Sequence, residues 1–193
     1  GVDLPDKFPV ITYHDAMERF GSDKPDMRFG LELNEFSEYV KKSDFNTFKD
    51  TLKDGGIVKA LVCPNADKYS RKVIDELTDY LKTYFKAKGL AWMKYVDDKL
   101  DGGISRFFPD PVKNKIISDL SVDKNSIIFI IGDSKNIVYG SLGALRIKLA
   151  NRENLIDKNM WRPLWVIDFP LVEWNEDQKR WESLHHPFTS PDL

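Results

Sequence analysis

The chain has 193 residues, of which 41% are hydrophobic and 12% aromatic, and its formal net charge is −2. This composition is typical of a folded domain and excludes a disordered or collagen-like chain. The near balance of charge argues against a global basic field for nonspecific nucleic-acid binding, although a local basic face is compatible with it. A single cysteine excludes an intramolecular disulfide and a multi-cysteine zinc site.

Proline and tryptophan are concentrated toward the two ends, whereas the middle is poor in proline and alternates between strand and helix patterns. We therefore expect a first flank at residues 1–33, a central domain at 34–152 and a second flank at 153–193. The central domain is expected to bury its own core and to fold without the flanks. The longest strongly apolar run, residues 126–131, is too short to cross a bilayer.

The first flank begins with a short helix pattern. Thr12 can cap this helix at its start and Gly21 can end it. A polar loop at residues 22–26 follows, and Met27–Leu33 has the pattern of a strand. The apolar residues of the helix recur on one face: Tyr13, Met17 and Phe20.

The central domain is predicted to contain two hairpins. Asn34 is placed to cap a short helix before the first of them. Strand-like runs at 48–52 and 57–62 flank one Gly-Gly turn, and runs at 90–96 and 104–108 flank another.

Longer helices are predicted after Ser70, from Asp110-Pro111 and after Ser134, the last of them extending to about Ala150. A buried strand at residues 127–131 precedes the last helix. Small residues on that helix are expected to allow close packing on a sheet: Gly140, Gly143 and Ala144.

This order of elements favours an α+β fold, with a mostly antiparallel sheet and helices on one face. The second flank adds two predicted strands, at residues 164–169 and 180–185. The flanks are expected to hold together through pairing of their strands.

Two polar or reactive positions have plain structural interpretations. The turn Gly132–Lys135 leads from a buried strand to a helix start, where a phosphate could bind, but it lacks the Walker A and dinucleotide glycine patterns. A strand-to-helix turn capped by Ser134 is the favoured interpretation. Cys63 has no recognisable histidine partner and is predicted to be a small buried residue rather than a nucleophile.

The charged helices are predicted to present solvated faces of mixed sign. The helix from Ser134 has no acidic residue up to Ala150 and carries Lys135, Arg146 and Lys148, so it is the better candidate for contact with RNA phosphates.

The pair His185 and His186 is the strongest candidate for a chemical role in the second flank. Adjacent residues of a strand point to opposite faces, and Pro187 indicates that the strand ends here, so one histidine could line a cleft. His14 is the only other histidine and completes no zinc motif. Without further context a structural role is favoured.

Three segments carry longer motifs. Residues 8–28 read FPVITYHDAMERFGSDKPDMR, Trp165–Glu173 reads WVIDFPLVE, and residues 184–191 contain HHPFT. In this order they resemble the segment after motif 2, the strand that re-enters the catalytic domain, and the following element of bacterial-type aspartyl-tRNA synthetases. The middle resembles their insertion domain, also called the GAD domain, in three stretches: residues 69–77, 88–94 and 142–149.

The resemblance implies a class II enzyme that activates L-aspartate with ATP, with Mg²⁺ assisting, and transfers the amino acid to tRNA. It implies a cytoplasmic, homodimeric parent enzyme with no membrane association. Motifs 1, 2 and 3 and the anticodon-binding domain are not present in this sequence, so the chain alone is expected to be an inactive fragment with no bound cofactor. The alternative is a non-catalytic tRNA-binding or protein-interaction module built on the same insertion fold.

The resemblance also suggests site residues. His185, with His186 beside it, matches the family's position next to bound L-aspartate, and Ser22, Asp23 and Lys24 match a loop near the catalytic cleft. No residue of this sequence is assigned a catalytic or metal-binding role. The insertion domain resembles one shared with transamidation proteins that act on charged tRNA, which suggests contact with tRNA rather than chemistry.

Overall fold

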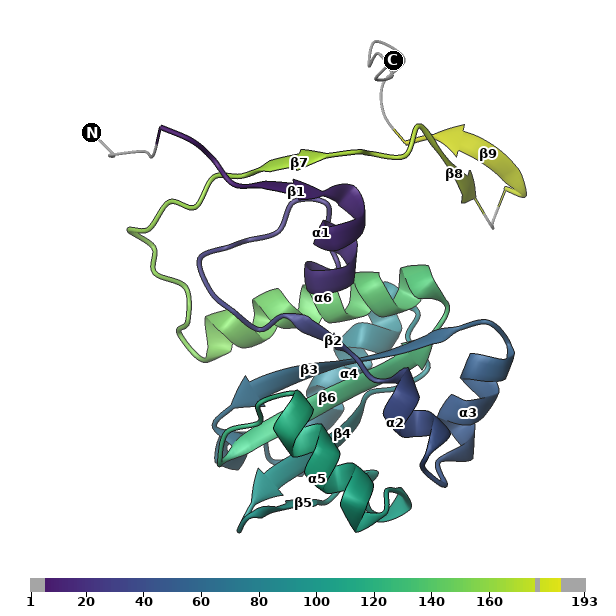
Figure 1. The fold of residues 1–193 in the computed structure, drawn as a ribbon, viewed down its shortest axis with the longest axis vertical. Helices are drawn as coiled ribbons and strands as arrows, with labels where there is room; N and C mark the ends of the chain where they lie inside the picture. The colour runs from purple at the N-terminus through teal and green to yellow at the C-terminus, as the bar shows by residue number, and fades with distance from the viewer. Residues whose placement is uncertain (1–5, 176–177, 185–193) are drawn as a thin grey trace.

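The computed structural model describes residues 6–175 and 178–184. A five-stranded sheet and its helices form the larger part of the molecule, and two short strand pairs lie beyond helix α6 (Figure 1). None of the helices in the described residues combines the length and the apolar character needed to cross a membrane.

The five-stranded sheet is antiparallel throughout. Its longest strand pair joins β3 and β6 over eight residues each, from Ile57 opposite Asp133 to Pro64 opposite Ser126. The strands, in their order across the sheet, are β2 (Leu33–Glu35), β3 (Ile57–Pro64), β6 (Ser126–Asp133), β4 (Ala91–Val96) and β5 (Lys99–Asp101).

Strand β6 is buried along its whole length because both of its faces are apolar. Ile127, Phe129 and Ile131 belong to one core cluster, and Ile128 and Ile130 belong to the other. The α+β class and the mainly antiparallel sheet are therefore confirmed. The prediction of helices on one face is wrong, since a sheet that is apolar on both sides needs a helical layer on each.

Two helices cover the first face, α4 (Arg71–Phe85) and α6 (Lys135–Arg152). Three shorter helices cover the second face: α2 (Ser37–Lys41), α3 (Asn46–Lys53) and α5 (Asp110–Asp119).

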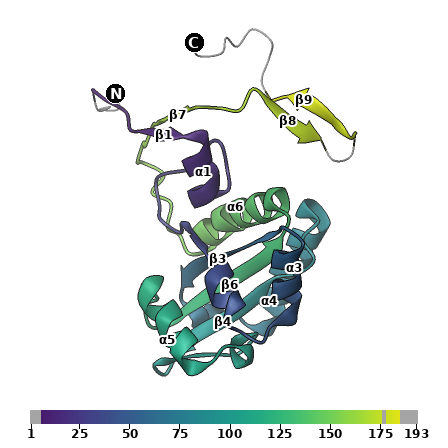
Figure 2. The ribbon, with the colours of Figure 1, turned by 45° about the vertical axis from the view of Figure 1, so that its right-hand side comes forward.

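The flanks form smaller elements on top of α6. Helix α1 (Tyr13–Phe20) lies between α6 and a parallel strand pair made of β1 (Val10–Thr12) and β7 (Trp165–Ile167) (Figure 2). A separate hairpin pairs β8 (Val172–Asn175) with β9 (Arg180–Ser183). Two 3₁₀ turns complete the chain: η1 (Ala66–Lys68) and η2 (Ser105–Phe107).

Several predicted caps are confirmed. Thr12 Oγ1 accepts the Asp15 N–H at 3.0 Å, and Gly21 ends α1 with a left-handed φ of 64°. Ser70 Oγ accepts the Val73 N–H at 3.4 Å at the start of α4.

In each of the two predicted hairpins, one of the two predicted strands is wrong. Phe48 and Leu52 are four residues apart, a spacing that suits a helix as well as a strand, and residues 46–53 form α3, which buries Phe48. Strand β4 pairs with β5 rather than with residues 104–108, because Asp97 and Asp98 adopt φ values of 51° and 60° and close the turn earlier.

Of the strand predicted at Met27–Leu33, only Leu33 lies in a strand, as the first residue of β2. Its preceding carbonyl groups converge on the buried guanidinium of Arg146, which an extended strand could not allow. Asn34 lies in β2 and does not cap α2. The Glu35 carboxylate serves there instead, accepting the N–H groups of Phe36 and Ser37 at 3.1 and 2.8 Å.

The last helix also differs in detail from its prediction. Ser134 occupies the N-cap position without a side-chain cap hydrogen bond, and its own N–H donates to the Asp133 carboxylate at 2.8 Å. The small surface of α6 faces the end of α1 rather than the sheet: a Cβ on Gly143 would lie 2.5 Å from the Gly21 carbonyl oxygen.

Candidate functional site

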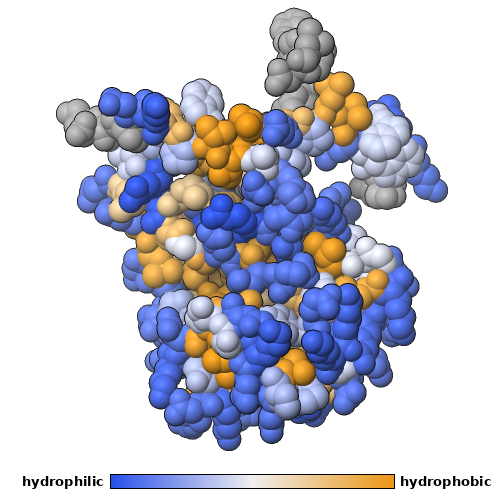
Figure 3. Space-filling model, viewed as in Figure 1, coloured by the Kyte–Doolittle hydropathy of each residue, from blue (hydrophilic) through white to orange (hydrophobic). Residues whose placement is uncertain are grey.

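A polar cleft lies where α1, the β7–β8 segment and the first turns of α6 meet. Its volume is about 790 Å³. We call it the α1–β8 cleft. Exposed apolar residues gather nearby on β1 and β7 (Figure 3). The polar and aromatic side chains of its walls come from both flanks and from α6: Tyr13, His14, Lys135, Asn136, Tyr139, Asp168, Glu173, Trp174 and Trp181.

Tyr13 lines this cleft within electrostatic reach of two carboxylates. Its ring packs against Phe169 with centroids 5.1 Å apart. Burial raises the pKa of the Tyr13 phenol, and the negative charges of Glu173 and Asp23 raise it further. Asp23, one of the loop residues singled out from the sequence, is therefore within electrostatic reach of the cleft.

The loop Ser22–Lys24 is seated on α6 by the close contact between Gly21 and Gly143. Ser22 Oγ accepts the Lys24 N–H at 3.2 Å. Ser22 and Lys24 line a separate cavity of about 280 Å³ with residues of α6, so the three loop residues do not converge on one cavity.

An ion-pair cluster with one buried member, Lys59, anchors α1 beside the cleft. The Glu18 carboxylate lies 2.7 Å from Lys59 Nζ and 3.5 Å from Lys135 Nζ, and it accepts the Tyr139 hydroxyl. Burial alone would raise the pKa of Glu18, but hydrogen bonds from Lys59 and Tyr139 and the lysine charges lower it to about 2. Because the Lys59 side chain is only 4% exposed, it depends on this carboxylate for neutralisation.

His185 and His186 lie outside the described residues. They follow Leu184 directly, and the N–H of Leu184 donates to the Leu171 carbonyl at 3.2 Å next to β8. His14 lines the cleft. Within the described residues no group of three or more His, Cys, Asp or Glu side chains could hold a metal ion.

The predicted role of Cys63 as a small buried residue is confirmed. Its thiol lies 3.2 Å from the Tyr69 hydroxyl, which also bonds to the Glu153 carboxylate at 2.8 Å. Burial raises the pKa of Cys63 to about 11, so the group remains a thiol at neutral pH.

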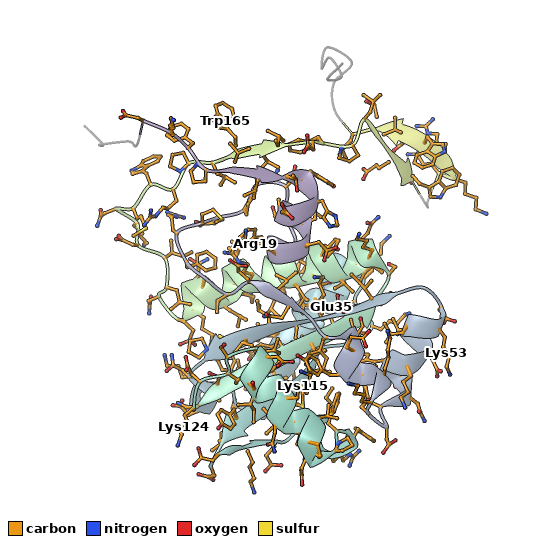
Figure 4. All side chains as sticks on the ribbon, in the orientation of Figure 1. Arg19, Glu35, Lys53, Lys115, Lys124 and Trp165 are labelled. Carbon is orange, nitrogen blue, oxygen red and sulfur yellow. The ribbon has the colours of Figure 1, made fainter. Side chains whose placement is uncertain are left out.

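Helix α6 does not present the basic face that was considered for RNA. Arg146 is 1% exposed, Lys135 pairs with Glu18, and Lys148 Nζ lies 4.3 Å from the ring centroid of Tyr80. Elsewhere on the central domain, exposed lysines pair with carboxylates and lie at the surface of the domain (Figure 4). Three labelled examples are Lys53, Lys115 and Lys124, with partners at 2.7–2.8 Å.

The α1–β8 cleft can recognise a polar ligand, since it combines carboxylates with an ammonium group and aromatic walls. Sequence reasoning did not single out Tyr13, Asp168 or Glu173 as cleft residues. The signal that could have identified them is that all three belong to the two flank motifs. The structure brings these motifs together because their strands, β1 and β7, pair in parallel. Nothing in the spacing alone showed that these strands are neighbours.

Comparison with known proteins shows what the central part of the chain is similar to. Residues 48–142 match the GAD domain family.

The whole chain, flanks included, is similar to a segment of bacterial aspartate–tRNA ligases. It is 48% identical over 192 residues to the aspartate–tRNA ligase of Staphylococcus carnosus and 49% identical over 193 residues to that of Staphylococcus epidermidis, covering 99% of this chain in each case. It is 42% identical over 190 residues, 98% of this chain, to the aspartate–tRNA(Asp/Asn) ligase of Caldanaerobacter subterraneus. The chain spans 32% of the length of each of these relatives. The resemblance to bacterial aspartyl-tRNA synthetases is thus confirmed for a segment of them that contains the GAD domain.

Proposed function

We propose that this chain is the GAD insertion, together with adjoining catalytic-domain segments, of an aspartate–tRNA ligase that activates L-aspartate with ATP and transfers it to tRNA. The observation that carries the proposal is the similarity over 99% of the chain, which includes both flanks as well as the GAD domain. A free-standing GAD module has no need of those flanks and is not favoured. The proposal includes a homodimeric, cytoplasmic parent enzyme, as the resemblance implies.

In this proposal the α1–β8 cleft is one wall of the L-aspartate site. His185 and His186, which follow β9 in the sequence and lie outside the described residues, are proposed to bind the same amino acid. A carboxylate ligand would favour the charged imidazolium of His185 and accept a charge-assisted hydrogen bond from it. The loop Ser22–Lys24 borders the same region through Asp23.

We assign ATP and Mg²⁺ to the parts of the longer relatives that this chain does not cover. The described residues do not fit a Mg²⁺ site, because they contain no suitable cluster of carboxylates, and we derive no step through the ion. We expect the 193-residue chain alone to show no aspartate-dependent exchange of pyrophosphate into ATP.

The test is aminoacylation by the longer protein that contains this chain. We expect it to charge tRNA with L-aspartate. His185→Ala should raise the KM for aspartate about tenfold or more, with little change in the KM for ATP, because a hydrogen bond to a charged group is lost. Lys53→Gln, on the far helix α3, is the matched control and should behave as the unaltered enzyme.

The two parts of the proposal fail separately. A longer protein that does not charge tRNA with aspartate would refute the function. Normal aspartate kinetics in the His185→Ala variant, together with a lower melting temperature, would show that His185 is structural and would leave the function standing.

A further inference from the structure

A second cavity, of about 950 Å³, opens between the two segments that connect the flanks to the central domain. Residues 27–32 lead into the domain and residues 160–164 lead out of it toward β7. We call this cavity the linker groove. The residues of its walls that matter here are Lys7, Phe20, Arg28, Phe29, Trp161 and Arg162.

One wall of the linker groove is held rigidly from behind. The buried guanidinium of Arg146 donates to the carbonyl oxygens of Asp26, Phe29, Gly30 and Leu31 at 2.9–3.1 Å. It also lies 4.9 Å from the ring centroid of Phe20 and 4.0 Å from that of Phe29, and both rings face the groove. The wall is therefore preorganised, which lowers the entropic cost of binding a ligand.

The linker groove is a cationic environment. Lys7, Arg28 and Arg162 line it, and an adjoining cavity of about 310 Å³ shares the last two and adds Lys158.

The carboxylates of these walls are already held by arginines. Asp26 forms a bidentate contact with Arg28 at 2.9 and 2.7 Å, and Glu32 does the same with Arg19 at 2.9 and 2.7 Å. Asp157 is also within electrostatic reach of Arg28. With Arg146 directly behind the wall, the positive charges still outnumber the negative ones.

Trp161 supplies an exposed aromatic surface in the same groove. Its side chain belongs to a residue that is 65% exposed, and the neighbouring Arg162 Nε donates to Met160 Sδ at 3.3 Å. An exposed indole beside arginine and lysine side chains is the combination with which proteins bind single-stranded nucleic acid: the bases stack and the cations follow the phosphates.

We propose that the linker groove binds a single-stranded segment of tRNA, with a base stacked on Trp161 and phosphates held by Lys7 and Arg162. The identity of the RNA as tRNA rests on the proposed function. Cations and aromatic rings in one groove suit phosphates and bases better than they suit an uncharged peptide segment, which would leave the cations unneutralised.

The test is fluorescence anisotropy of a short fluorescein-labelled single-stranded RNA, and of unlabelled tRNA as competitor, with the 193-residue chain. Trp161→Ala should weaken binding about 5- to 100-fold, the range for loss of one base stack. Arg162→Gln should make the slope of log affinity against log salt shallower by about 0.7, the value for one phosphate contact on a single strand. Trp165→Ala is the matched control, since Trp165 is similarly exposed at 61% but does not line the groove.

Wild-type affinity in the Trp161→Ala variant, or an equal loss in the Trp165→Ala variant, would overturn the proposal. Acrylamide quenching of Trp161 fluorescence in the longer protein, measured without RNA, is a second test. If Trp161 is shielded from acrylamide there, another part of that protein occupies the groove and the proposal is overturned. If the longer protein charges tRNA while its groove variants bind and charge normally, the groove proposal alone fails. If it binds RNA through Trp161 but does not charge tRNA with aspartate, the proposed function alone fails.

Discussion

Replacing Arg146 by methionine should uncouple the first flank from the central domain. Methionine keeps much of the length and the apolar contact between Phe20 and Phe29, but it cannot donate to the four backbone carbonyl groups that the guanidinium holds. The substitution therefore tests the polar part of the contact with little loss of packing.

The magnitude follows from opposing terms. Hydrogen bonds to a charged group contribute about 1.5–3 kcal/mol each, and they are not additive when one group makes all of them. Removing the buried charge returns part of its desolvation cost, because burial already lowers the pKa of Arg146 to about 10. We expect a net loss of about 3 kcal/mol in the free energy of unfolding, or roughly 6–12 °C in melting temperature for a chain of this size.

Urea unfolding and hydrogen exchange measure this effect. The amides of residues 26–31 should lose protection while those of β6 keep theirs. Arg152→Met is the matched control on the same helix, since Arg152 is exposed and only lies over the Tyr69 ring at 5.6 Å. The proposed role of Arg146 in holding the backbone of residues 26–31 would be refuted by a change below about 0.5 kcal/mol in the free energy of unfolding of Arg146→Met, or by equal changes in both variants.

Three further outcomes are expected. Gly143→Ala should destabilise the chain by about 1–3 kcal/mol in urea unfolding, because its Cβ would meet a carbonyl oxygen at 2.5 Å, whereas Gly140→Ala, whose nearest neighbour is at 3.7 Å, should be neutral or stabilising by up to about 1 kcal/mol. The lowered pKa of Glu18 means that its contribution, about 1–3 kcal/mol, is present above pH 4.5 and is lost as pH falls toward 2; Glu18→Gln should remove this acid dependence in thermal melts, and Glu76→Gln should not. A fragment of residues 34–152 should unfold cooperatively by tryptophan fluorescence, and in it Arg146→Met should cost less than about 1 kcal/mol, since the clamped carbonyls are absent.

The elements that sequence reasoning located correctly are those with local causes. Thr12, Gly21 and Ser70 act within one turn of the helices that they begin or end, so their residue types are sufficient signals. The continuous apolar run at 127–131 likewise predicted a buried strand without any knowledge of its neighbours.

The failures have non-local causes. Met27–Leu33 has strand-like composition, yet Arg146, more than 100 residues away in sequence, determines its conformation. Phe48 fits two periodicities, and only the second core cluster decides between them. The α1–β8 cleft was beyond sequence spacing for the same reason, because β1 and β7 are parallel neighbours separated by the whole central domain.

Two buried cations of the central domain explain how the first flank is held. Lys59 on β3 and Arg146 on α6 are 3% and 1% exposed, and each finds its polar partners in residues before 33. A buried cation that loses such partners is strongly unfavourable unless water can reach it, so separating the flank from the domain would expose both charges together. Helix α1 and the loop after it are therefore fixed against α6 as one body. The α1–β8 cleft and the linker groove are both lined in part by residues of the first flank, so the same two side chains keep the cavities in their relative placement.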